Sequence, residues 1–232
     1  MASSAFWKLR RLGPRAVRIL QRRKTGSKVI AAYEATLPPK VNAFTGAYDG
    51  AVRYKASWRK EQVEGKGAIA ALLKGMREWL PLVKRDVPGF NASEYGDKPD
   101  VPDDVIEDGS RFAEVVDEHR TAPGSPLPYH DECLAVLEPA VQAAAKEWEE
   151  AEAADKHYQE LLGKMRATGA EMDTELQAFR RTLAAVGGRR DRAYQKLRAQ
   201  RAYETDEDDD PTAPAPPSPL PPVPAVGPTP PR

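Results

Sequence analysis

The amino-acid sequence predicts an all-α protein: an elongated antiparallel coiled-coil hairpin or helical bundle, followed by a disordered, proline-rich C-terminal tail. Three observations lead to this prediction. A heptad pattern of apolar residues runs from Leu134 to Leu197, and a shorter one runs from Trp58 to Val83. Residues 211–232 then contain 11 of the 22 prolines of the chain.

The longer heptad pattern is the main feature of the chain. From Leu134 to residue 200, 16 of the 20 a and d positions are apolar, counting Ala and Tyr as apolar. Three or four heptads in phase already argue for a coiled-coil seam, so this stretch should pack against another helix. The a positions also include Asp155, Gly169 and Arg190. A polar residue at an a position can fix the register of two helices.

The shorter pattern predicts a helix over about 47–86 that pairs antiparallel with the long one. Gly65, Gly67 and Gly75 reduce its intrinsic helicity, but a glycine on a seam also lets another backbone approach closely. Pro81 should kink or end this helix. Whether the two helices pair within one chain or between chains stays open. The predicted interaction seam consists of Leu134, Val141, Trp148, Tyr158, Leu162, Met165, Met172, Leu176, Phe179, Leu183, Val186, Trp58, Ile69, Leu72, Met76 and Trp79.

The positions of prolines and glycines along the sequence predict the domain organisation. We expect a basic arm (1–28), a helical bundle (29–203) and a tail (204–232), with helices at about 16–35, 47–86, 103–119 and 131–203. Pro38-Pro39 should end the first helix, and residues 40–46 read as a connection. Asp103 or Asp104 can cap the third helix, whose apolar face should pack on the bundle. Gly187-Gly188 predicts a bend within the last helix.

The basic arm contains nine Lys and Arg residues and no acid within residues 1–28. Three interpretations stay open: a solvated arm or one docked on a protein, a clamp for nucleic acid or an anionic membrane, and an organelle-targeting segment. Pro14 should interrupt any single helix here. The candidate contact residues of the arm are Trp7, Lys8, Arg10, Arg11, Arg15, Arg18, Arg22, Arg23 and Lys24.

Charge is strongly segregated along the chain although the formal net charge is zero. Residues 1–60 contain 14 Lys and Arg against 2 Asp and Glu, and residues 88–160 contain 5 against 19. Such blocks can pair within the chain, between chains or with an external polyion.

Catalytic and cofactor chemistry is not indicated. No phosphate-binding loop, nucleophile elbow, HExxH or CxxC motif occurs, and no pair of carboxylates stands out as an acid and a base. We therefore expect no enzyme activity, cofactor or metal. The single cysteine, Cys133, favours a reducing compartment such as the cytoplasm, with targeting to an organelle through the Arg-rich N-terminus as the alternative. No apolar run approaches the ~20 residues of a membrane-spanning helix.

These features predict a structural or adaptor protein that assembles through its long heptad helix with itself or with a helical partner. The alternative is a polyanion-binding protein that uses residues 1–60, with the coiled coil for dimerisation. The tail adds an acidic run (204–210) and the sequence PLPPVP at 219–224. The P-x-x-P spacing of that segment suits an SH3- or WW-type reader.

Overall fold

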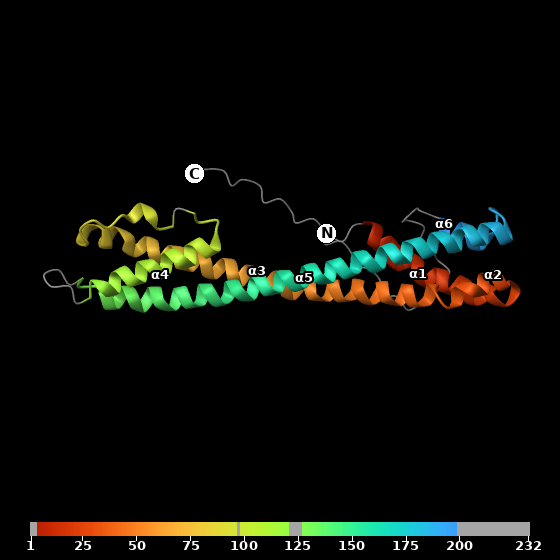
Figure 1. Cartoon of the computed structure of the whole chain (residues 1–232), viewed down its shortest axis with the longest axis horizontal. Coiled ribbons are helices and arrows are strands. Elements are labelled where there is room, and N and C mark those ends of the chain that lie inside the picture. The colour runs from red at the N-terminus through yellow and green to blue at the C-terminus, as the bar shows by residue number, and fades with distance from the viewer. Residues whose placement is uncertain (1–3, 97, 121–126, 199–232) are drawn as a thin grey trace, which may run out of the picture. The chain divides into compact units, whose positions relative to one another are not determined.

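Two long helices form the centre of the protein. In the computed structural model, α3 (Leu37–Asp86, 50 residues) and α5 (His130–Gly187, 58 residues) pack side by side (Figure 1). They run antiparallel: Lys40 contacts Glu175, whereas Gly75, further along α3, lies beside Leu137 near the start of α5. The structure describes residues 4–96, 98–120 and 127–198, all in one folded unit that contains helices and no strand. The predicted helical bundle is confirmed.

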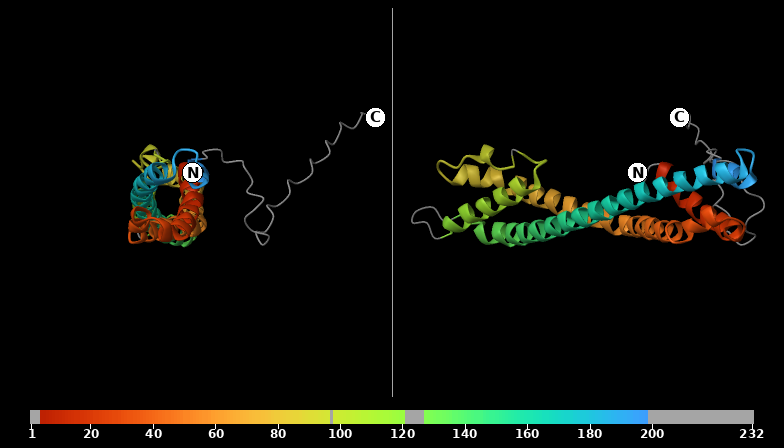
Figure 2. Two further views of the ribbon diagram at one scale, coloured as in Figure 1. Left: turned by 90° about the vertical axis from the view of Figure 1, so that its right-hand side faces the viewer. Right: turned by 45° about the vertical axis from the view of Figure 1, so that its right-hand side comes forward.

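Shorter helices cover the two ends of this pair. Figures 1 and 2 show α4 at one end and α1, α2 and α6 at the other. These four are α1 (Ser4–Arg23), α2 (Lys28–Ala31), α4 (Pro102–Glu118) and α6 (Arg192–Arg198). Single 3₁₀ turns are η1 (Lys24–Gly26), η2 (Ala32–Glu34) and η3 (Ala92–Glu94).

The apolar core is divided into two clusters, one at each end. The first unites α1, α2 and α6 with the facing ends of α3 and α5, and its buried side chains include Leu20, Phe44 and Phe179. The second unites α4 with the opposite ends of α3 and α5, and it includes Phe112 and Leu137. The shorter helices therefore cover apolar surface of α3 and α5 that the two long helices alone would leave exposed.

A polar and aromatic layer joins α3 to α5 between the clusters. The Trp58 indole donates from Nε1 to Oδ1 of Asp155 (2.9 Å), and the Trp58 ring stacks on Tyr158 with centroids 4.7 Å apart. Gln62 donates from Nε2 to the carbonyl oxygen of Ala151 (2.8 Å). Asp155, an exception in the heptad pattern, thus accepts a bond that would be lost if the helices shifted by one turn. The layer favours a single register.

The N-terminal region differs from the prediction, because residues 4–23 form one helix that belongs to the bundle. Ala16 and Leu20 are fully buried, so most of the predicted arm is part of the fold. Pro14 lies inside α1 without ending it. Its side chain faces solvent, and Gly13 before it has no Cβ to clash with the ring. Packing of the apolar face therefore outweighs the ~3 kcal/mol that an internal proline costs.

The predicted helix at 16–35 is divided, and the predicted connection at 40–46 is helical. The first piece ends at Arg23, and after η1 Ser27 caps α2 by accepting a bond from the Ile30 amide. Leu37 begins α3, with prolines in its first turn. The first amides of a helix have no carbonyl partner in any case, so proline at this place starts a helix and does not break one. The predicted end of α3 at residue 86 is confirmed.

The last predicted helix, 131–203, is also divided. It ends at Gly187, because Gly188 adopts φ +78°, a conformation that favours glycine. Asp191 then begins α6 by accepting hydrogen bonds from the amides of Ala193 (2.7 Å) and Tyr194 (3.3 Å). Leu197 is still buried in the first cluster, so the apolar pattern continues on a separate helix.

At the start of α4, the N-cap lies two residues before the first of the predicted caps. Pro102 is the first helical residue and Val101 the N-cap, without a side-chain bond, so Asp103 and Asp104 lie within the first turn. In the first turn, the positive end of the helix dipole stabilises their negative charges. The predicted apolar face of α4 is confirmed, since Phe112 is fully buried.

An ion pair near the first cluster gives a testable pH dependence. Burial raises the pKa of Glu175, but hydrogen bonds from Thr36 and Lys40 outweigh burial and leave the pKa below its ordinary value. Glu175→Gln should therefore lower the free energy of unfolding by about 1 kcal/mol at neutral pH. A lowered folded-state pKa means that this stabilisation is complete above the unfolded pKa and is lost as the pH falls through the folded one. Urea titrations should show the difference shrinking between about pH 5 and pH 3. Glu171→Gln, at an exposed site on the same helix, is the control; equal effects from both variants would contradict the prediction.

Candidate functional site

Antiparallel packing converts the charge blocks of the sequence into two charged ends. Residues 4–60 and 161–198 lie at the end with α1 and together contain 23 Lys and Arg against 6 Asp and Glu. Residues 61–160, which supply the other end, contain 10 against 23. In Figure 2 the red and blue segments lie together at the first end, and the yellow and green segments lie at the second. We call them the basic end and the acidic end.

The basic end presents one ordered row of cations on α1. This row, the basic stripe, consists of Lys8, Arg11, Arg15, Arg18 and Arg22. Successive members are three, four, three and four residues apart, which keeps them on one helix face over about 21 Å. Four of the five are exposed and Arg15 is half-buried. The opposite face of α1 is buried, so the orientation of the stripe is set by the core.

Ion pairs fasten the flanks of α1 to the bundle. Arg10 pairs with Asp49 (2.9 Å) in α3, and Arg23 pairs with Asp191 (3.0 Å) just before α6. The predicted contact residue Lys24 pairs with Glu34, in the second 3₁₀ turn. These three cations therefore form ion pairs that stabilise the fold. Lys8, Arg11 and Arg22, in contrast, form no ion pair with any residue in the described part of the chain.

Trp7 lies next to the stripe and is accessible to an external partner. Its side chain is 44% exposed, and the Arg11 guanidinium carbon lies 4.8 Å from the ring centroid. The pair is a cation–π contact that holds the indole at the surface. Trp7 is one of the candidate contact residues predicted for the arm, and its exposed ring leaves it accessible.

The predicted interaction seam lies mostly inside the bundle. Met165, Met172, Leu176, Phe179 and Leu183 are buried in the first cluster, and Leu134, Ile69, Leu72 and Met76 in the second. Val141, Trp148, Tyr158, Leu162, Trp58 and Trp79 are half-buried. Val186 is 50% exposed, so it lies outside the part of the seam that is buried within one chain. It occupies the last turn of α5, beyond the start of α3.

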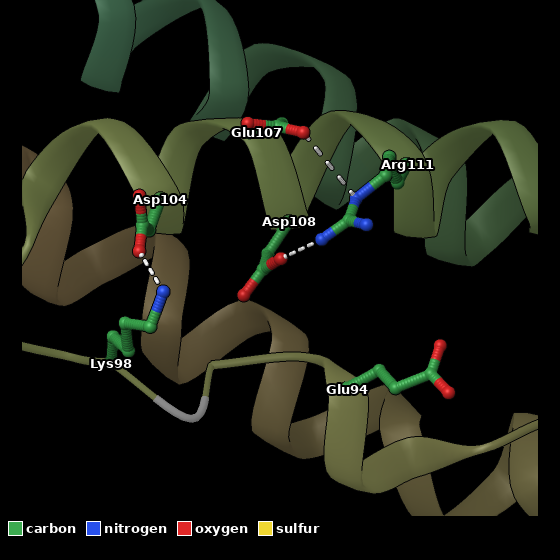
Figure 3. A pocket seen from close by; sticks show the side chains of 6 residues that line it. All are labelled: Glu94, Lys98, Asp104, Glu107, Asp108 and Arg111. Atoms are coloured by element: carbon green, nitrogen blue, oxygen red, sulfur yellow. Dashed lines mark hydrogen bonds and ion pairs between the residues drawn. The ribbon is translucent and has the colours of Figure 1, made fainter.

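A polar pocket of about 420 Å³ lies between η3 and α4, at the acidic end (Figure 3). Asp108, only 4% exposed, accepts a bond from the Gly96 amide (2.7 Å) and pairs with Arg111. Lys98 pairs with Asp104 (2.9 Å) across the same pocket. These contacts tie the preceding loop to α4, so we assign the pocket a structural role. Nothing in the sequence distinguished Asp108 from its acidic neighbours.

Comparison with protein-family models, with curated proteins and with solved structures found no match to this chain. Its function must therefore be argued from its own geometry.

Reactive and metal-binding groups do not converge in the described ranges, 4–96, 98–120 and 127–198. No group of three or more His, Cys, Asp or Glu side chains there is placed to hold a metal ion. Burial raises the pKa of the Cys133 thiol to about 12, which keeps it protonated at neutral pH. Within the same ranges, no helix combines the length and the apolar character needed to cross a bilayer. The acidic run and PLPPVP segment lie outside the described residues.

Proposed function

We propose that this protein is a non-enzymatic structural or adaptor protein that binds single-stranded nucleic acid through the basic stripe of α1. The α3–α5 pair acts in this proposal as a coiled-coil scaffold that holds α1 rigid. The observation that supports it best is the stripe itself: five cations in register on one face of a helix, at an end of the bundle where bases outnumber acids by 23 to 6.

The chemistry of the stripe suits a phosphate backbone. Lys and Arg side chains that neutralise phosphates release condensed counterions, which supplies most of the affinity of non-specific binding. Trp7 adds an exposed aromatic ring on which a base can stack, and stacking of this kind tolerates any sequence. A row of cations beside an aromatic side chain is the combination that single-strand-binding proteins use.

An anionic membrane is the competing polyanion, and the burial of α1 argues against it. Helices that lie in a membrane surface insert an apolar face among the lipids. The apolar face of α1 is already packed in the first cluster, where Ala16 and Leu20 have no exposed area. Within α1 as the structure describes it, Trp7 is the one large apolar side chain that is exposed for insertion, so membrane binding would depend mainly on electrostatic attraction.

The heptad seam is the competing surface for a protein partner. Most of its residues are buried or half-buried within one chain, so a partner helix could reach the buried ones only after α3 and α5 separate. For this reason the proposal assigns external contacts to the charged surface of the bundle.

The test is a charge reversal with a matched control. In Lys8→Glu/Arg11→Glu/Arg22→Glu, each changed side chain is exposed and lacks an ion pair with the described residues. Fluorescence anisotropy with a labelled single-stranded oligonucleotide should show binding weakened at least about tenfold. The slope of log K against log salt should fall by about 2, since each lost phosphate contact contributes about 0.7. Trp7→Ala should weaken binding with little change in that slope.

The control variant is Lys66→Glu/Arg77→Glu/Lys84→Glu, which makes the same charge change at exposed sites on the other half of α3. It should bind the oligonucleotide like the unaltered protein. Equal losses in both triple variants would show that net charge and not the stripe controls binding. Tight binding to vesicles of anionic lipid, with no binding of the oligonucleotide, would overturn the proposal in favour of a membrane.

A further inference from the structure

The acidic end presents a row of charged residues that matches the basic stripe in spacing. This row, the acidic stripe, lies on α4 and consists of Asp104, Glu107, Arg111, Glu114 and Glu118. Its members are also three, four, three and four residues apart, again over about 21 Å of helix. Four of the five positions are acidic, where the corresponding five positions of α1 are all basic.

The orientation of α4 is as firmly determined as that of α1. Val105, Phe112 and Val116 are buried in the second cluster, on the face opposite the stripe. Gly109 lies so close to Leu72 and Val141 that an added Cβ would stand about 3.0 and 3.1 Å from them. Because α4 cannot rotate without losing these contacts, the acidic stripe is held toward the outside of the bundle.

Part of the acidic stripe is neutralised locally and part is not. Asp104 pairs with Lys98, and Glu107 lies 4.0 Å from the Arg111 guanidinium. Glu114 and Glu118 are exposed and form no ion pair with any residue that the structure describes. These two carboxylates, on the last turns of α4, face solvent in the same way as Arg11 and Arg22 on α1.

We propose that the occupant of the acidic stripe is a second copy of this chain, with α1 of one copy lying along α4 of the other. The two stripes have equal length, the same residue spacing and opposite charge. They are on different ends of one molecule, so α1 and α4 of the same chain cannot satisfy each other. This inference adds a contact surface on α4, which the proposed nucleic-acid binding leaves unused, and it does not depend on that binding although both use the basic stripe.

The expected association is weak and electrostatic. Exposed ion pairs contribute little individually, and salt screens them over about 10 Å at 0.1 M ionic strength. A contact between unlike ends either repeats along an open row of copies or closes when two copies join by both ends. In both cases a nucleic acid bound to the basic stripe should compete with the second copy.

Sedimentation velocity on the full chain gives the first measurement. At about 20 mM salt the mean mass should rise with protein concentration above the 25.5 kDa of one chain. At about 0.5 M salt it should return to that of a monomer. A mass that stays monomeric at low salt across the whole concentration range would overturn the proposal, as would an oligomer that persists in high salt.

A charge swap identifies the surfaces. Lys8→Glu/Arg11→Glu/Arg22→Glu and Glu107→Lys/Glu114→Lys/Glu118→Lys should each remain monomeric at low salt. An equimolar mixture of the two should associate, because the altered α1 of the first variant is acidic and the altered α4 of the second is basic. Glu138→Lys/Glu149→Lys/Glu152→Lys, at exposed sites on α5, is the control for net charge and should still self-associate.

The same variants separate this inference from the proposed function. The α4 variant should lose self-association and keep oligonucleotide binding, whereas the α1 variant should lose both. Unchanged helicity by circular dichroism would exclude misfolding as the cause. Self-association that survives both single variants, or a mixture that stays monomeric, would overturn the α1–α4 contact even if the oligonucleotide binds as proposed.

Discussion

Replacing Phe179 with aspartate is expected to lower the free energy of unfolding by about 5 kcal/mol or more. Phe179 has no exposed surface, and its ring meets that of Tyr33 edge-on with centroids 5.2 Å apart. The substitution removes a large apolar side chain and places a carboxylate in the cluster that joins α2 and α5. Folded domains are stable by only about 5–15 kcal/mol, so much of the available stability should be lost.

Urea unfolding followed by circular dichroism at 222 nm measures this effect, and Val186→Asp is the matched control. Val186 and Phe179 occupy the same heptad position, one repeat apart, yet Val186 is 50% exposed. Its replacement should change the free energy of unfolding by no more than about 0.5 kcal/mol. A large loss in Val186→Asp would mean that the seam extends to the end of α5, and a small loss in Phe179→Asp would mean that the first cluster is not packed.

Replacing Gly65 with leucine is expected to destabilise the bundle by about 3 kcal/mol. An added Cβ at this position would lie 2.9 Å from the Ala151 Cβ and 3.1 Å from the Glu147 carbonyl oxygen. The backbone of α5 cannot yield as a flexible side chain would, so the helices must separate. Separation would also stretch the bond from Gln62 to Ala151 in the central layer.

Gly67→Leu provides the control, because both glycines lie in the same turn of α3 and both variants make the same Gly-to-Leu change. No atom lies within 4 Å of a Cβ added at Gly67. Leucine there should stabilise the helix by up to about 1 kcal/mol, since glycine is a poor helix former. Thermal melts of the two variants should therefore shift in opposite directions; shifts of equal sign would refute close approach of α5 at Gly65.

The predictable part of the fold consists of elements with a long, regular pattern. The end of α3 at Asp86, the start of α5 at His130 and the apolar face of α4 all follow from periodicity and from proline or glycine. The errors lie at prolines and glycines whose effect depends on position. Pro14 lies within a helix, and Pro38-Pro39 begins one, because packing and hydrogen-bond position determine what a proline costs.

The candidate site was predictable in composition and not in geometry. Residues of the basic arm and Trp7 could be named from the sequence, because a block of nine bases without an acid is visible in one dimension. Arg10 and Arg23 pair with carboxylates that lie 39 and 168 positions away in the sequence. Lys8, Arg11 and Arg22 form no such pair with the described residues, and this difference could not be read from the sequence. The acidic stripe could not be predicted from the sequence, because acidic residues are abundant throughout that part of the chain.

By itself, the sequence determined that long helices form, which face of each is apolar, and that charge is divided into blocks. These are local properties, set by residue spacing and by the backbone preferences of proline and glycine. Tertiary structure alone decided where the apolar faces are buried: α3 packs on α5 of the same chain, and α1 joins their core. It also decided that like-charged blocks far apart in sequence meet at one end, because antiparallel pairing brings residues 4–60 beside residues 161–198. An apolar face favours burial against any complementary helix, and only the connections and the fit of the whole chain select which one.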